Sequence, residues 1–313
     1  MNKESKKGNV LLNNYSVRAT TDEKIPTVVI EGVEYLDIGK IFDCGQCFRF
    51  EPVENSQHEK EFVGVAFGRF VSFAQEGDTL YIYNSTADDF ESVWYPFLSL
   101  DCDYSVMTED ILSRSDKEAL RLAVNYGQGI RILRQDEWET VCSFIISQQN
   151  NIPRIKKIVE SLSRRLGTPI SAPGMEEHGG SSDGIAYAFP TPQAVFDAGE
   201  DVLAELKTGF RAKYILDAAR RVLDGSLDFD FLRNCDDLDQ CRKHLLSVRG
   251  IGDKVANCSL LFGFEKLNAF PVDVWIRRVI QKYFPENYDP LELGAYAGLA
   301  QQYLFYYERY INN

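Results

Sequence analysis

Apolar and polar positions alternate in the first third of the chain and follow a helical period in the rest. Between residues 27 and 84, apolar residues alternate with polar ones or come in short runs, which is typical of β-strands. Gly68 and the run 76–78 separate these segments and supply turn geometry. The pattern predicts antiparallel strands in TVVIEGVEYLDI, EFVGVAF, RFVSFAQ and TLYIYN.

After about residue 89, apolar residues recur at the three- and four-residue spacing of amphipathic helices. Asp136 followed by Glu139 predicts an N-cap and capping box that open the helix EWETVCSFIISQQ. A second helix follows in IPRIKKIVESLSRRLG, and the Gly/Ser/Pro-rich stretch 168–184 is expected to be a surface loop. Further helices are predicted near residues 193–205, 211–224, 236–247, 254–264, 272–283 and 291–310.

These patterns predict an α+β fold, with an N-terminal antiparallel β-sheet domain followed by a mostly helical domain. We expect residues 1–22 to form a polar tail and residues 23–130 to form the sheet domain with flanking helices. Residues 131–313 would form the helical domain, with a hairpin at 248–254.

Composition excludes several classes of protein. No apolar run reaches the roughly 18 residues of a membrane span, and the polar first residues do not resemble a signal peptide. We therefore expect an intracellular protein, a monomer without a membrane partner. The seven cysteines, an odd number without framework spacing, predict free thiols rather than disulfides.

The net charge of −13 argues at first against a polyanionic partner, but the charge is uneven along the chain. Residues 205–282 contain 14 basic and 11 acidic residues, and residues 153–166 contain five basic residues and one acidic residue. A phosphate-binding face on an acidic protein is therefore compatible with the sequence.

One segment, CRKHLLSVRGIGDKVANCSLLFG, has the form of a helix, a tight Gly-x-Gly hairpin and a second helix. Gly250 and Gly252 would permit positive φ and the close approach of another backbone. The hairpin amides and the N-terminus of the second helix would form an anion site that fits a DNA phosphate. On this motif alone, an αα-corner whose glycines serve only packing remains an alternative.

The hairpin is followed by Lys254 and, 19 residues later, by Asp273 at an N-cap position in FPVDVWIRRVI. This set resembles the helix-hairpin-helix DNA glycosylases, in which a Gly/Pro-rich loop and a catalytic Asp follow the hairpin. Four more segments resemble the 8-oxoguanine DNA glycosylase family, in that family's order and over most of the chain after about residue 27. They are DCGQCFRF, GIRILRQDEWETVCSFIISQQNNIPRI, GFRAKYI and YAGLAQQYLFYY.

The resemblance implies a bifunctional DNA glycosylase and lyase that excises 8-oxoguanine from double-stranded DNA, preferably opposite cytosine. The catalytic residues would be Lys254 and Asp273. The carboxylate would stabilise positive charge that develops on the sugar, and the uncharged amine would attack the anomeric carbon and form a Schiff base, which permits β-elimination. Burial and the positive end of the helix would both favour the uncharged amine.

The resemblance also implies a pocket for a flipped-out base. Cys258 and Phe305 would sandwich the purine, and Gln301 would contact its Watson–Crick edge. The carbonyl of Gly45 would accept the N7 hydrogen that 8-oxoguanine has and guanine lacks. Taken singly, Cys258 and Phe305 could equally be core residues, and Gly45 a turn residue.

On the DNA side, the resemblance implies that Phe210 is a wedge that fills the gap left by the flipped nucleotide. Arg154, Arg211 and Gln149 would contact the cytosine left unpaired. The other expected DNA-binding residues are Asn150, Asn151, Gly250, Gly252 and Trp275.

The chain departs from the family pattern at three of its positions. Gln149 stands where the family has asparagine, which puts strict selection for cytosine in doubt. Trp275 stands where relatives often have histidine, and Arg249 where many such hairpins have proline.

No cofactor or metal is expected. Cys44-Gly-Gln-Cys47 matches a C-x-x-C motif, but the chain has three histidines, no second C-x-x-C and no nucleotide-binding glycine motif. Two other functions remain open: a helix-hairpin-helix glycosylase for another damaged purine that uses Asp273 without the lysine, and a non-catalytic DNA-binding module.

Overall fold

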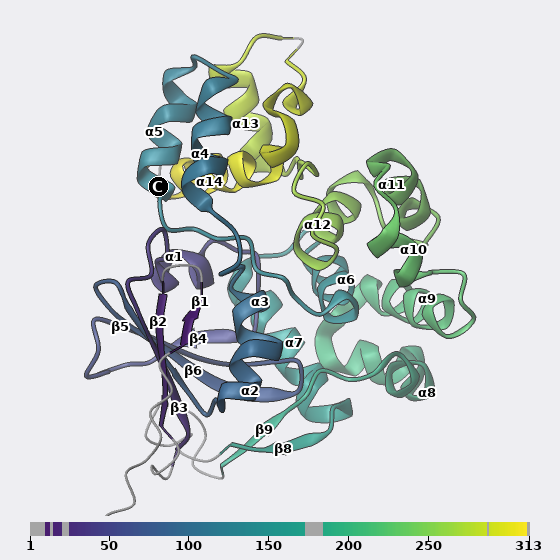
Figure 1. Ribbon diagram of the computed structural model, residues 1–313. Helices are drawn as coiled ribbons and strands as arrows, with labels where there is room; N and C mark the ends of the chain where they lie inside the picture. Colours follow the sequence, from purple (N-terminus) through teal and green to yellow (C-terminus); the bar gives the residue numbers. More distant parts are fainter. Residues whose placement is uncertain (1–9, 13–14, 21–24, 173–183, 287, 312–313) are drawn as a thin grey trace, which may run out of the picture.

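The computed structural model of the chain describes residues 10–12, 15–20, 25–172, 184–286 and 288–311 (Figure 1). Its N-terminal part is a seven-stranded sheet with the order β1-β2-β3-β7-β6-β5-β4, in which every neighbouring pair is antiparallel. The strands are β1 (Val10–Leu12), β2 (Tyr15–Thr20), β3 (Thr27–Glu31), β4 (Phe50–Pro52), β5 (Lys60–Ala66), β6 (Arg69–Glu76) and β7 (Thr79–Tyr83). The α+β prediction is confirmed.

The sequence correctly predicted the turns that join β5 to β6 and β6 to β7. Phe67 and Gly68 have φ values of 50° and 67°, which suits a two-residue turn between β5 and β6. Gly77, with φ 55°, turns the chain between β6 and β7. In the register that results, Phe73 pairs with Ile82, and both side chains are fully buried.

One face of the sheet is covered by short helices. These are α1 (Ile38–Asp43), α2 (Ala87–Asp89), a π-helical turn (Phe90–Trp94) and α3 (Tyr95–Phe97). The buried Trp94 packs edge-on against Phe73, at 5.5 Å between ring centres. The segment TVVIEGVEYLDI, predicted as a strand over 27–38, is a strand only to Glu31, because Asp37 starts a helix at Ile38 by accepting a hydrogen bond from the backbone N–H of Lys40.

The prediction of a polar tail over residues 1–22 is wrong for part of this segment. Strands β1 and β2 lie within it and extend the sheet, with Val17 paired to both Val10 and Ile30. In β2, Tyr15 and Val17 are buried whereas Ser16 and Arg18 are partly exposed, so the segment has the alternation of a half-buried strand. Residues 1–9, 13–14 and 21–22 of the expected tail lie outside the described residues.

The rest of the chain is mostly helical. Its longer helices are α4 (Tyr104–Ser113), α5 (Glu118–Gly127), α6 (Glu137–Ile146), α7 (Ile152–Leu166), α8 (Pro192–Leu203), α9 (Ala212–Leu223), α11 (Leu238–Leu246), α12 (Asp253–Gly263), α13 (Val274–Tyr283) and α14 (Ala297–Ile311), with the shorter α10 (Phe229–Asn234) between α9 and α11. Figure 1 shows α4, α5, α13 and α14 together at the top and α8 to α11 at the right, with α6 and α12 between the two groups.

The packing of α4 and α5 does not follow the domain boundary that the sequence predicts at residue 130. Helices α4 and α5 do not flank the sheet, because α5 packs along α14 and their apolar residues join the core of the helical part. Tyr104, Ile111 and Leu120 belong to this core, whereas Leu100 belongs to the sheet core. The two cores therefore meet near residues 100–104.

Two segments differ in their secondary structure from the prediction. In the stretch 168–184, Pro169–Ser171 forms β8, which pairs with β9 (Ile185–Tyr187); residues 173–183 lie outside the described residues. The helix expected over 291–310 begins as a 3₁₀ segment, Pro290–Tyr296, which is interrupted at Gly294 (φ 75°) and leads into α14 at Ala297.

Two predictions from composition were tested. In the part of the chain that the structure describes, no helix combines the length and apolarity needed to cross a membrane. All seven cysteines are free thiols, as expected.

Candidate active site

A cavity of about 790 Å³ lies where the two helical groups meet the loop that follows α1. This volume is within the roughly 300–1,000 Å³ of small-molecule pockets. Twelve of the expected site residues line it: Gly45, Gln149, Asn150, Asn151, Phe210, Gly252, Lys254, Cys258, Asp273, Trp275, Gln301 and Phe305. The other three, Arg154, Arg211 and Gly250, do not.

Lys254 lies in the first turn of α12, half-buried in the cavity wall. Its Nζ is 2.8 Å from the Oγ of Ser147 and 5.0 Å from the ring centre of Phe144. The Ser147 hydroxyl donates to the carbonyl of Phe144 at 2.8 Å, so its oxygen is oriented to accept from the amine. The amine is therefore held in the cavity between a hydroxyl and an aromatic face.

Asp273 is the N-cap of α13, and its carboxylate accepts a 2.8 Å hydrogen bond from the backbone N–H of Ile276. Burial raises the pKa of Asp273, although this hydrogen bond and the nearby charge of Lys254 act in the opposite direction. The two expected catalytic groups therefore line one cavity and interact electrostatically, each at the start of a helix.

Three expected base-pocket residues come from α12 and α14. Cys258 lies one turn after Lys254 and is buried, and burial raises the pKa of its thiol to about 11, so the thiol is neutral near pH 7. On α14, Gln301 and Phe305 are one turn apart, so both face the cavity. Gln301 is 4% exposed, and its Oε1 has no hydrogen-bond partner among the described residues. A buried acceptor of this kind requires a ligand or water.

Gly45 lies in the loop between α1 and β4. Its φ of +77° favours glycine, and a Cβ atom there would lie 3.3 Å from Ile152 Cδ1 and 3.6 Å from Phe305 Cε1. A Cβ atom at position 45 would therefore crowd Ile152 and touch the ring expected to stack on the base. The neighbouring Cys44 carbonyl accepts a 2.6 Å hydrogen bond from Gln302.

The structure corrects part of our interpretation of the hairpin. Gly250 has φ +83°, but its close neighbour is a side chain rather than a backbone, because a Cβ would lie 2.2 Å from Tyr214 Cγ. Gly252 does not need positive φ: it has φ −104° in extended backbone, and a Cβ would meet nothing within 4 Å. Packing explains Gly250, whereas Gly252 leaves an exposed, open surface beside the start of α12.

Arg249, where many such hairpins have proline, uses the N–H group that proline lacks. Its backbone N–H donates to Asp217 Oδ2 on α9 at 3.1 Å. The same carboxylate accepts from Arg220 at 3.0 Å and Arg221 at 2.9 Å. This contact fixes the hairpin to α9.

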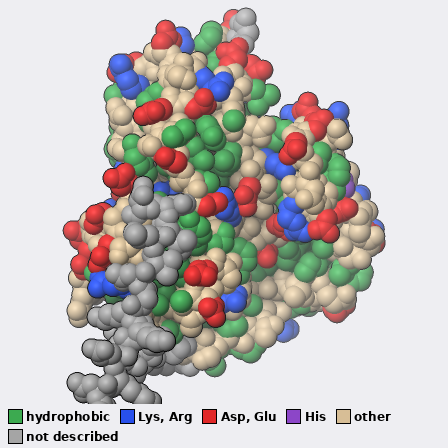
Figure 2. All heavy atoms as spheres, viewed as in Figure 1, with side chains coloured by type: hydrophobic (Ala, Val, Ile, Leu, Met, Phe, Trp, Pro, Cys, Tyr) green, Lys and Arg blue, Asp and Glu red, His purple; other side chains and the backbone are tan. Residues whose placement is uncertain are grey.

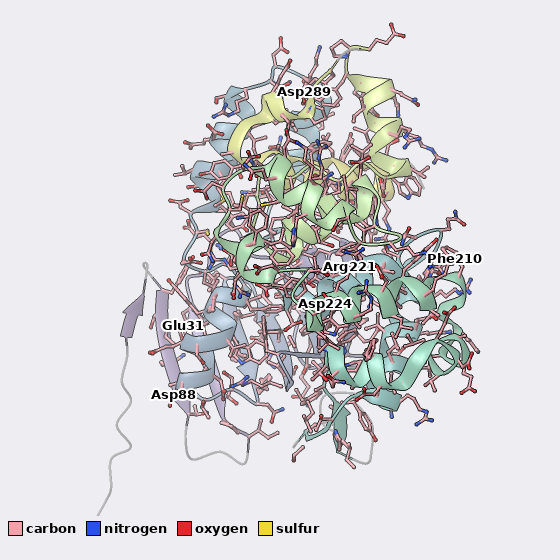
Figure 3. All side chains as sticks on the ribbon, turned by 90° about the vertical axis from the view of Figure 1, so that its right-hand side faces the viewer. Glu31, Asp88, Phe210, Arg221, Asp224 and Asp289 are labelled. Atoms are coloured by element: carbon pink, nitrogen blue, oxygen red, sulfur yellow. The ribbon has the colours of Figure 1, made fainter. Side chains whose placement is uncertain are left out.

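Phe210 and Arg211 follow α8 and precede α9. Phe210 is 46% exposed, and Figure 3 places it at the edge of the molecule. Arg211 is buried, and its guanidinium donates to the carbonyls of Gln148 (2.9 Å) and Gln149 (3.1 Å). In the structure Arg211 thus holds the loop after α6 rather than projecting from the surface.

Gln149 adopts a left-handed conformation, with φ 47°. Asparagine, which the family has here, tolerates this conformation better than other non-glycine residues. The hydrogen bond from Arg211 to the Gln149 carbonyl stabilises the turn. Glutamine in place of asparagine at position 149 therefore makes the left-handed backbone less favourable and also lengthens the side chain.

The remaining expected DNA-binding side chains surround this loop. Asn150 donates to the carbonyl of Ile146 at 3.1 Å, and Asn151 caps α7 by accepting from the backbone N–H of Arg154 at 3.0 Å. Arg154 is exposed, and Trp275 is half-buried at the cavity with Arg278 over its ring at 5.2 Å. Burial, and to a lesser degree the charge of Arg154, lowers the pKa of Arg211.

Sequence reasoning missed Ser147 and Phe144, which contact Lys254, and Gln302, which bonds the residue before Gly45. No local motif marks them, because the bonds to Ser147 and Gln302 join positions 107 and 258 residues apart. In the C-x-x-C motif, burial raises the pKa of Cys44 to about 12 and also raises that of Cys47, so both thiols are protonated near pH 7. The described residues contain no group of three or more potential metal ligands.

Comparisons with known proteins place the chain in one family. Residues 28–141 match the 8-oxoguanine DNA glycosylase N-terminal domain, and residues 142–294 match the HhH-GPD superfamily of base excision DNA repair proteins. The N-glycosylase/DNA lyase of Saccharomyces cerevisiae is 36% identical over 197 residues, which are 59% of this chain and 49% of the yeast protein. The match thus spans about half of that relative's length.

Two solved structures are similar over nearly their full length. One is the 8-oxoguanine glycosylase/lyase of Clostridium acetobutylicum in complex with double-stranded DNA that contains cytosine opposite 8-oxoguanine. Its TM-score is 0.83 and its identity to this chain is 34%, and the match covers 95% of this chain and 98% of that chain. MBOgg1, in complex with a low-affinity DNA ligand, has a TM-score of 0.81 and 36% identity, covering 96% and 99%. On its two domain matches and on this similarity, the chain belongs to the 8-oxoguanine DNA glycosylase family, within the helix-hairpin-helix superfamily of base excision DNA repair proteins.

Proposed function

We propose that this protein removes 8-oxoguanine from double-stranded DNA, preferably opposite cytosine, and then cleaves the strand by β-elimination. The observation that carries the proposal is the shared cavity, in which Lys254 and Asp273 face an apolar pocket with an unpartnered acceptor on Gln301. A flipped purine would bring its glycosidic bond to these two groups.

In this reaction the uncharged Nζ of Lys254 attacks C1′ of the damaged nucleotide, and the bond from C1′ to the base breaks. The electron pair of that bond leaves with the base, which takes up a proton. The ionised carboxylate of Asp273 stabilises the positive charge on the sugar. Loss of a proton from nitrogen and opening of the sugar give a Schiff base; the acidic C2′ proton then leaves and the 3′ phosphate is expelled.

The binding roles follow the cavity walls. Cys258 and Phe305 would stack on the two faces of the purine, Gln301 would contact its Watson–Crick edge, and the Gly45 carbonyl would accept the N7 hydrogen. Outside the cavity, Phe210 would fill the gap in the duplex and the amides near Gly252 would bind a phosphate. The cytosine left unpaired would be contacted by Gln149 and Arg154, with Arg211 holding the loop that carries Gln149. Asn150, Asn151, Trp275 and Gly250 would line the DNA surface.

The test is base release and strand cleavage on duplexes that differ only at the lesion. We expect both activities on 8-oxoguanine opposite cytosine, lower rates opposite the other three bases, and no change when a chelator is added. Release of an alkylated purine without strand cleavage would favour the other enzymatic hypothesis. Binding without release of any damaged base would favour a non-catalytic module.

A further inference from the structure

The segment 43–46, which comprises the last residue of α1 and the start of the loop before β4, is fixed by side chains from other parts of the chain. Three of its four carbonyls accept a hydrogen bond from such a side chain, and the fourth, that of Gly45, accepts none from the described residues. The three bonds run from Arg309 Nη1 to Asp43 (2.8 Å), from Gln302 Nε2 to Cys44 (2.6 Å) and from Gln135 Nε2 to Gln46 (2.8 Å).

This arrangement controls the orientation of the Gly45 carbonyl. Glycine has no Cβ and at φ +77° its neighbouring peptides rotate easily, so the carbonyl would turn away from an unfavourable partner if the loop were loose. Guanine would set its N7 acceptor against the carbonyl oxygen, whereas 8-oxoguanine presents a donor. Only a carbonyl that cannot turn away penalises guanine.

Of the three donors, Gln302 bonds the residue directly before Gly45. Its bond to Cys44 O is the shortest of the three and fixes the peptide plane that directly precedes Gly45. The side chain is 3% exposed, so no water competes readily for the bond. It also follows Gln301, so α14 carries both the acceptor in the base pocket and the group that fixes the opposite loop.

We propose that Gln302 is a positioning residue for lesion specificity, which holds the Cys44–Gly45 peptide so that the Gly45 carbonyl discriminates 8-oxoguanine from guanine. This inference rests on the proposed function. It assigns to Gln302 no contact with the DNA, so its effect should appear in discrimination rather than in general affinity for the duplex.

The experiment measures two dissociation constants with the same protein, for an 8-oxoguanine:cytosine duplex and for the matching guanine:cytosine duplex. Lys254→Gln serves as the parent, so that the base is not released. Gln302→Met removes the amide donor and keeps the length of the side chain. We expect the ratio of the two constants to fall roughly three- to tenfold, the effect of losing one hydrogen bond. Inactive protein cancels in this ratio.

Gln75→Met in the same parent is the matched control. Gln75 is also buried and donates to two backbone carbonyls, those of Leu36 (2.8 Å) and Gly77 (2.9 Å), but it does not line the cavity. We expect this control to lower the Tm and to keep the parental ratio.

Three outcomes would count against these conclusions. An unchanged ratio in the Gln302→Met variant would overturn the role of Gln302, and so would an equal fall in the Gln75→Met control. A Lys254→Gln parent that binds both duplexes equally would contradict the proposed function itself.

Discussion

Burial disfavours the charged form of Asp273, although the proposed reaction needs that form. Its carboxylate is buried enough that its pKa is raised, even with a backbone hydrogen bond and a nearby ammonium group that favour the charged form. A neutral cap would serve α13 as well, since asparagine is as good an N-cap as aspartate. In the proposed function, the charge would act on a bound sugar, since the fold does not require it.

Asp273→Asn should separate these two effects. The amide oxygen can still cap α13, so we expect an equal or higher Tm, whereas base release should slow by about 100-fold because the electrostatic stabilisation is lost. Thermal unfolding and single-turnover base release on one protein preparation measure both. A variant that releases base at the wild-type rate would contradict the role of the carboxylate.

The pH dependence of stability follows from the same shift. Because the pKa of Asp273 is raised on folding, the folded state holds this proton to higher pH than the unfolded state. Its contribution to the free energy of unfolding therefore falls as pH rises from the ordinary carboxyl range through the folded-state pKa. The stability of Asp273→Asn relative to wild type should increase over that window, as urea unfolding at a series of pH values would show. A pH-independent difference would contradict the shift.

At the scale of elements, two contacts fix the hairpin before α12. Gly250 packs against the ring of Tyr214, and the N–H of Arg249 is bonded to Asp217; both partners lie on α9. The start of α12, and with it Lys254, is positioned by these contacts. An arginine is tolerated at position 249 because the chain uses its backbone donor.

Arg249→Pro should therefore cost stability even though many such hairpins carry proline. We expect the free energy of unfolding to be about 1 kcal/mol lower than in Arg249→Ala, which loses the same side chain and keeps the N–H. Urea unfolding of the two variants makes the comparison. Equal stabilities would show that the bond to Asp217 contributes nothing.

The features that the sequence predicts correctly are those that depend on residues close together in the chain. The N-cap at Asp273, the helix after it and the hairpin turns depend on neighbouring residues, and each was expected at its observed place. The role of Gln302, in contrast, depends on a residue 258 positions away. The sequence places α4 and α5 with the sheet domain because their packing partners, the 3₁₀ segment 290–296 for α4 and α14 for α5, come much later in the chain. Packing partners of this kind leave no periodic signal.

At the scale of the whole molecule, the proposed function would require an acidic protein to bind a polyanion. The net charge is −13, and Figure 2 shows acidic and basic side chains interspersed over the face it presents. Around the cavity, Arg277 and Arg309 in its wall and the exposed Arg154 offset this charge locally. Binding would thus depend on local phosphate contacts, with no support from the overall charge.

Salt titration tests this division between phosphate contacts and the base pocket. Affinity for both the 8-oxoguanine duplex and the matching guanine duplex should fall with rising salt and with the same slope, because phosphate neutralisation is common to both. The vertical offset between the two lines measures the contribution of the pocket. A flat response for the damaged duplex would contradict the DNA-binding assignment.

The most direct test of the account is borohydride reduction during turnover on an 8-oxoguanine duplex, followed by peptide mapping of the covalent product. We predict a protein–DNA adduct on the peptide that contains Lys254, and none with Lys254→Gln, although that variant still binds the duplex. An adduct that forms undiminished in the variant, or that maps to another residue, would show that the amine at the start of α12 is not the nucleophile.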